Sequence, residues 1–540
     1  MPAITGPELA FSPDGLAVEI GWVLSNARLY ATDPRLQRAS QFSASISPPV
    51  HRAQIGRWES GTTSVSHAQV RRYEVVLGLP EGQLLTMVDL LARERQLTTA
   101  QPYLVPVRPP TWEDETDDLL DLARSDDRMT PLQWRTLSTH LGSVTTTFLR
   151  RDDWTHLLRR VSLEASLSTG LDYILRDVAK LSLASHPRST RAVLDMVDEV
   201  LSDPVAPVYG ETLGLLLAVP GPEPVELVLR HLRNPIGPAA HFSLMWMARS
   251  MVNQAVVSPR QLTQMGRYAV EALDDSTASH RVHRSAASFL EVLDGPERCT
   301  VVADLLSETT RRRVGRIIEH GGALGDEQVT TLADEVERRL AAAQSPRGAL
   351  HPVFASLLRT AAGLSAEDSR GTALSLLMLS PQRDVVGETY ARALRWALEQ
   401  DREPVIDEAL SVLAWLLPPT AVPWMLELAF DPSTEPTRAT QALVSVANAQ
   451  TPMQTAPEGY GPDDVVEMVR RSALALMTDP GPEPDVSTRG HLYLLGMYGR
   501  FDAITGLADA AARPGVPPQW ALGIRSWLEV PLWARPERVR

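Results

Sequence analysis

Residues 51–61 read HRAQIGRWESG, and this stretch organises the N-terminal part of the chain. Ile55 and Trp58 are three positions apart, so a helix would place both side chains on one buried face. The other side of that helix carries Arg52, Gly56, Arg57 and Ser60. A helix of this kind packs on its own domain with one face and presents cations with the other, as a DNA-reading helix must. We expect it to end near Gly61, because glycine tolerates the left-handed conformation that terminates helices.

Apolar periodicity predicts four more helices around this one. Upstream they cover residues 15–30 and 34–43, and the second has Ala39 and Phe42 facing inward. Downstream they cover residues 66–77 and 80–92, and the second of these begins at Pro80, a favoured first helical residue. The apolar face of residues 66–77 consists of Val70, Tyr73, Val76 and Leu77.

Three consecutive motifs then resemble a known family. The run IGRWESG at residues 55–61 is followed by VRRYE at 70–74 and LGLPEGQLL at 77–85. Together they resemble the lambda-repressor-like (XRE family) helix-turn-helix, whose pattern is I-S-x-W-E-x-G. The resemblance covers roughly residues 13–92. The chain departs from the family at residues 43–49, SASISPP, which lengthen the turn before the recognition helix.

The resemblance implies a set of DNA-contacting residues. Arg52 and Arg57 would read base edges, because a guanidinium pairs bidentately with guanine. Arg38 and His51 would hold phosphate, and Gly56 would let the backbone come close to the DNA. The full set is Arg38, His51, Arg52, Ala53, Gln54, Gly56, Arg57 and Ser60. The resemblance also implies double-stranded DNA as partner and a homodimer, which we expect to form chiefly outside residues 1–95.

Charge is distributed unevenly along the chain. From Arg28 to Arg72 there are seven arginines and two carboxylates, whereas the whole chain has a formal net charge of −14. A cationic segment on an anionic body suits a protein that touches nucleic acid at one end only.

Residues 97–110 contain four prolines and little charge, a composition that favours extended chain. We therefore divide the chain into a DNA-binding domain at residues 1–96, a Pro-rich linker at 97–111 and a second domain at 112–540. From residue 112 onward, apolar-periodic stretches alternate with Asp-Pro or Asn-Pro joints, and strict period-two alternation is almost absent. This texture predicts an all-α protein.

One helical hairpin in this second domain is clearly defined. Residues 421–432, AVPWMLELAFDP, are followed by residues 436–447, PTRATQALVSVA. The pair resembles a HEAT repeat, and residues 224–233 with 238–251 match the same pattern less well. We therefore expect a five-helix lambda-repressor-like domain followed by an irregular HEAT-like α-helical repeat solenoid. A compact, non-repeating all-α domain is the alternative.

Catalytic and cofactor motifs are absent from the sequence. Cys299 is the single cysteine, and His280 and His283 have no third ligand nearby, so we expect neither a metal site nor a cofactor. No spacing assembles a nucleophile with a base, and we do not expect an enzyme. The chain has no apolar stretch of about 18 residues and no signal segment, which predicts a cytoplasmic protein without membrane contact.

These features predict a sequence-specific transcriptional regulator. Its helical-repeat domain would mediate dimerisation, effector sensing or binding of a partner protein. The alternative is a helical-repeat interaction scaffold, whose helix-turn-helix serves assembly rather than DNA reading.

Overall fold

The computed structural model is all-helical throughout the residues that it describes, and these residues contain no β-strand. This confirms the predicted all-α class. The described residues are 13–95, 102–104, 112–144, 149–203, 210–254, 256–278, 280–293, 307–320, 326–342, 351–362, 367–449, 460–481 and 483–537. Of the predicted extended linker, only residues 102–104 are among them, and the rest of that segment lies outside the described residues.

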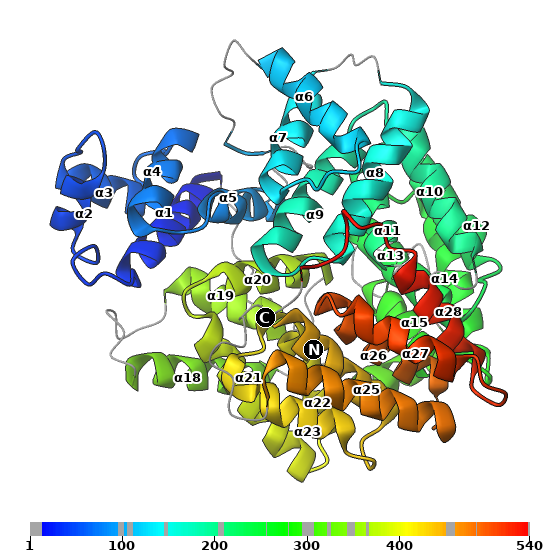
Figure 1. Ribbon diagram of the computed structural model, residues 1–540. Helices are drawn as coiled ribbons and strands as arrows, with labels where there is room; N and C mark the ends of the chain where they lie inside the picture. The colour runs from blue at the N-terminus through cyan, green and yellow to red at the C-terminus, as the bar shows by residue number, and fades with distance from the viewer. Residues whose placement is uncertain are drawn as a thin grey trace.

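The first five helices, which we call the head (residues 13–95), project from one side of the molecule (Figure 1). The outermost are α2 and α3, whereas α5 points into the body. The helices are α1 (Pro13–Leu29), α2 (Ala39–Ser45), α3 (Arg52–Glu59), α4 (His67–Leu77) and α5 (Gln83–Glu94).

Two of these helices begin later than predicted. Residues 34–37 form a turn, so α2 starts at Ala39 instead of residue 34. Helix α5 starts at Gln83 instead of Pro80, because Gly82 takes a left-handed conformation with φ 83°. The carboxylate of Glu74 accepts hydrogen bonds from the backbone N–H groups of Gly82, Leu84 and Leu85. It thereby caps α5 from outside, which a local reading of the sequence does not reveal.

The described residues between 112 and 537, which we call the body, are mostly helical. Its first part contains α6 (Trp112–Arg124), α7 (Pro131–Gly142), α8 (Arg151–Ser166), α9 (Gly170–Ala184), α10 (Thr190–Ser202), α11 (Gly210–Leu213), η1 (Gly214–Ala218), α12 (Glu223–Leu232), α13 (Pro238–Asn253), α14 (Pro259–Asp274), α15 (His280–Leu293) and α17 (Glu308–His320). Its second part contains α18 (Asp326–Ala342), α19 (Pro352–Ala362), α20 (Glu367–Leu379), α21 (Arg383–Glu399), α22 (Glu403–Leu416), η2 (Pro419–Ala421), α23 (Val422–Phe430), α24 (Pro436–Asn448), α25 (Pro462–Thr478), α26 (Pro484–Met497), α27 (Phe501–Ala511) and α28 (Pro518–Leu528).

Neighbouring helices of the body pack in a regular order. Most contact the next helix in sequence and also the next but one, as in the row α20, α22, α24, α26 and α28. The C-terminal residues then return to the first helices of the body. Arg128 donates to the backbone oxygen of Trp533 at 3.3 Å, and the guanidinium of Arg160 lies 4.4 Å from the Trp533 ring centroid. The end of the chain is thus fastened to α8 and to the loop before α7.

Buried apolar side chains form two contiguous clusters. One contains side chains of α6 to α17, and the other joins the head to α18 through α28 and includes Ile174 and Val178 of α9. Helix α5 accounts for this sharing, since residues 84–92 are all buried. It packs against α20 and α9 of the body as well as against α1 and α4 of the head. The head therefore shares its core with the body, and the predicted domain boundary near residue 96 stays a prediction.

Candidate nucleic-acid interface

Helix α3 is short, and its apolar side chains anchor it. His51 precedes it as the N-cap, with Nδ1 accepting from the N–H of Ala53 at 3.2 Å. Ile55 is 0% exposed and Trp58 is 3% exposed. Trp58 packs edge-on against Tyr73 of α4, at 6.4 Å between ring centroids. The predicted inward pair is therefore confirmed, and it fixes which side of α3 faces solvent.

A buried ion pair holds the C-terminal end of α3. Arg28 of α1 donates through Nε to Oε1 of Glu59 at 2.6 Å and through Nη2 to Oε2 at 2.7 Å. The hydroxyl of Tyr73 also donates to Glu59, at 3.3 Å. Burial alone would lower the pKa of Arg28, but the bond and charge of Glu59 outweigh burial and raise that pKa. Burial and the Glu59 charge both raise the pKa of Tyr73, so its hydroxyl stays protonated.

Two glycines bring α1 and the end of α3 into close contact. Gly61 has φ 71°, and a Cβ there would lie 2.5 Å from the carbonyl oxygen of Ala17. A Cβ on Gly21 would lie 2.6 Å from the carbonyl oxygen of Glu59. The expected left-handed residue at Gly61 is confirmed, and Gly61 also allows the close approach of α1, which was not predicted from the sequence.

The lengthened turn before α3 is closed by an apolar residue. Ile46 is 1% exposed, so the segment after α2 folds back onto the head core. The N–H of Val50 donates to the carbonyl of Ser43 at 3.3 Å, which closes the loop. The burial of Ile46 was not predicted, although an isolated apolar residue among serines and prolines is a usable signal in the sequence.

The structure brings the predicted contact residues together on and just before the outer side of α3. The exposed residues of this set are Arg38, His51, Arg52, Ala53, Gly56, Arg57 and Ser60. Gln54 is half-buried. Arg38 immediately precedes α2, whereas the others lie on α3 or at its two caps.

The cationic charge of the head separates into two groups. Arg28 pairs with Glu59, and Arg71 pairs with both Glu74 and Glu81. Arg38, Arg52 and Arg57 form no ion pair with any described residue. The unpaired positive charge of the head is thus smaller than the number of arginines predicts. The arginines without an ion pair include the three that are proposed to meet DNA.

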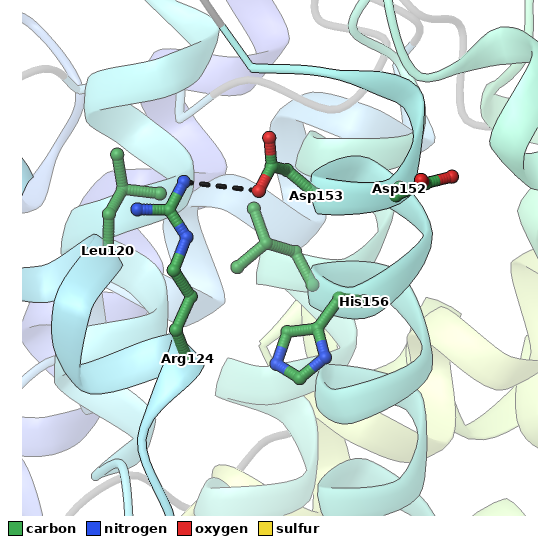
Figure 2. Close-up of a pocket in the computed structure, with 6 residues that line it drawn as sticks. Leu120, Arg124, Asp152, Asp153 and His156 are labelled. Atoms are coloured by element: carbon green, nitrogen blue, oxygen red, sulfur yellow. Dashed lines mark hydrogen bonds and ion pairs between the residues drawn. The ribbon is translucent and has the colours of Figure 1, made fainter.

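The body offers a shallow pocket between α6 and α8 (Figure 2). Its volume is about 280 Å³, and Leu120, Arg124, Asp152, Asp153, His156 and Leu157 line it. Arg124 pairs with Asp153 at 3.2 Å across the opening, and His156 bonds the carbonyl of Ala123 at 3.0 Å. Since Arg124 and His156 already have protein partners, the pocket does not indicate a ligand class.

Comparisons with known proteins do not identify a relative. No protein-family model, no curated protein and no solved structure matches this chain. Among the helices that the structure describes, none is long and apolar enough to cross a membrane.

Proposed function

We propose that this protein is a sequence-specific DNA-binding transcriptional regulator, with a lambda-repressor-like head that inserts α3 into the major groove. The observation that carries the proposal is the division of α3. Ile55 and Trp58 are buried, whereas Arg52 and Arg57 are exposed without a carboxylate partner. Unpaired guanidinium groups on an exposed helix face suit guanine edges and phosphates.

The position of α3 also supports the proposal. It lies at the outer end of the head, on the side away from the body (Figure 1). The body is anionic on balance, so a DNA duplex would be repelled from the body and would meet the head first. Most body helices contact the next helix and the next but one, which supports an irregular HEAT-like solenoid for the body. The solenoid would dimerise or bind an effector or a partner protein.

A second function has one observation in its favour. Because α5 is buried between the head and the body, the head helps to complete the core of the body. That arrangement also suits an interaction scaffold in which the helix-turn-helix serves assembly alone. The two functions differ in what Arg52 and Arg57 do, because a scaffold needs neither side chain.

The test is to purify the full-length protein from cells with the DNA it retains and to sequence that DNA. A regulator is expected to enrich a short shared motif, and a protein with Arg52→Ala and Arg57→Ala is expected to lose it. Equal recovery of DNA by both proteins, without a motif, would reject the proposal.

A further inference from the structure

Helix α20 belongs to the second part of the body and contacts the head directly. It packs against α5 of the head and against α19, α21 and α22 of the body, and it also contacts α9. A change in how α20 sits on α22 would therefore reach α5 directly.

Side chains from α20 and the residues just after it hold the head. Burial raises the pKa of Glu94, the last residue of α5, and the hydroxyl groups of Ser369 and Thr372 oppose this rise, so both side chains act on the Glu94 carboxylate. At the other end of α5, the side chain of Gln83 donates to the carbonyl of Leu379 at 2.9 Å. Asn26 and Gln382 exchange two amide hydrogen bonds, at 2.9 and 2.6 Å.

The residue next to Ser369 holds α20 to the body. Arg370 donates to the carboxylate of Glu408 at 2.7 Å and to the hydroxyl of Ser411 at 3.2 Å, both on α22. It also donates to the carbonyl of Ala361 at 3.0 Å. The Glu408 side chain is only 8% exposed and that of Arg370 is 19% exposed. The adjacent residues Ser369 and Arg370 therefore interact with different elements. Ser369 interacts with Glu94 of the head, and Arg370 interacts with α22.

Glu408 lies in a crowded electrostatic environment. The charged groups that act on it are Arg370 from α20, Arg284 from α15 and its neighbour Asp407, and it in turn acts on Tyr390 of α21. From α24, Arg438 approaches Asp407 at 3.9 Å and Glu403 at 3.1 Å. Burial raises the pKa of Glu408 to about 7, and the attraction of Arg370 opposes that rise only in part.

We propose that the Arg370–Glu408 ion pair couples the body to the head through α20, and that proton uptake by Glu408 loosens the contact between α20 and α5. When Glu408 gains a proton, Arg370 loses its anionic partner on α22. It keeps only its bond to the Ser411 hydroxyl on α22 and its bond to the Ala361 carbonyl of α19. Helix α20 is then held less firmly to α22, and its contact with α5, which includes the Gln83–Leu379 hydrogen bond and the interaction of Ser369 and Thr372 with Glu94, weakens. The effect on DNA binding rests on the proposed function, whereas the coupling itself does not.

The test is hydrogen exchange of the full-length protein at pH 8 and pH 6, corrected for the intrinsic pH dependence of exchange. In the wild type, amides of α5 are expected to exchange about fivefold faster at pH 6 than at pH 8. Glu408→Gln should show the fast rate at both pH values, because the amide cannot regain the charge. Glu403→Gln is the matched control on the same helix, since Glu403 is exposed, and it should behave as wild type.

Ser369→Ala separates the contact of α20 with the head from the contact of α20 with α22. It should speed exchange in α5 at both pH values while leaving α22 unchanged, because it removes only the head side of the connection. The proposal is overturned if α5 exchange in the wild type does not change with pH, or if Glu408→Gln keeps the wild-type response. It is also overturned if Glu403→Gln has the same effect as Glu408→Gln.

A DNA-binding measurement is made on the same proteins. Glu408→Gln is expected to change DNA affinity at pH 8 by about fivefold, toward the wild-type value at pH 6. If neither the wild type nor any variant binds DNA, the proposed function is wrong. The hydrogen-exchange result then still decides whether the coupling between the body and the head exists.

Discussion

Arg28 and Glu59 form a two-point ion pair, with N–O distances of 2.6 and 2.7 Å, between the end of α1 and the end of α3. Their side chains are 6% and 9% exposed. The pair uses the carboxylate of α3 inside the head, so it does not neutralise Arg52 or Arg57 on the outer side. A motif residue that looks like surface charge in the sequence is therefore a positioning residue for the exposed face of α3.

Glu59→Gln should destabilise the head. It leaves the buried Arg28 without a carboxylate, and breaking a buried pair in this way costs roughly 3–5 kcal/mol. The measurement is hydrogen exchange in the full-length protein. The amides of α3 and α4 should exchange faster than in the wild type, because local unfolding of the head becomes more frequent. Glu81→Gln is the control, because Glu81 is 59% exposed and its loss should change stability by less than about 1 kcal/mol. Unchanged protection of α3 in Glu59→Gln would show that the pair does not hold the helix.

Arg57→Ala and Arg38→Ala should weaken DNA binding in different ways. Arg57 lies on the outer side of α3, so its loss should cost roughly 1–3 kcal/mol on the cognate site and less on random DNA. Arg38 precedes α2 and is expected to hold phosphate, so its loss should weaken both about equally. Titration of each variant with both DNAs distinguishes these outcomes. Equal affinity of Arg57→Ala and wild type for the cognate site would show that Arg57 does not read bases.

His491 should make the C-terminal helices sensitive to acid. Burial lowers its pKa to about 4, and its bond to the Ser487 carbonyl opposes this only in part. The unfolded chain takes up this proton near pH 6.5 and the folded chain only near pH 4, so stability falls as the pH falls through this window. The loss should be on the order of 2–3 kcal/mol.

Thermal melting between pH 7 and pH 4 measures this effect. His491→Gln should melt with a weaker pH dependence than the wild type over that window. His51→Asn, which changes an exposed histidine and retains an N-capping side chain, should keep the wild-type dependence. The same pH dependence in His491→Gln and wild type would rule out His491 as the source.

The protein should be a homodimer formed chiefly outside residues 1–95. One recognition helix covers only a few base pairs, so two half-sites are needed for a useful site. Helix α5 is buried on the body and offers little surface to a second head, which leaves the body for a symmetric contact. Mass measurement in solution at micromolar concentration tests this, with and without DNA. A monomer under both conditions would contradict it.

Local sequence pattern was sufficient for the helical class and for the orientation of α3. Ile55 and Trp58 could be placed because their spacing is a property of one helix. The partners of Glu59 and Glu74 could not be predicted, since each bonds groups on other helices. The burial of α5 was also missed, because its apolar side chains give the same periodicity whether they face the head alone or the body as well. Gln382 and Asn26 are 356 positions apart, and no local pattern connects them.

The most direct test of DNA binding by the head is the salt dependence of duplex binding. Fluorescence anisotropy would measure the affinity of the full-length protein for random duplex DNA between about 50 and 200 mM salt, a range over which phosphate contacts weaken strongly. The affinity should fall steeply as salt rises, and Arg38→Ala should flatten the slope by about one unit. Absence of binding at the lowest salt, or an affinity that does not change with salt, would contradict the proposed function.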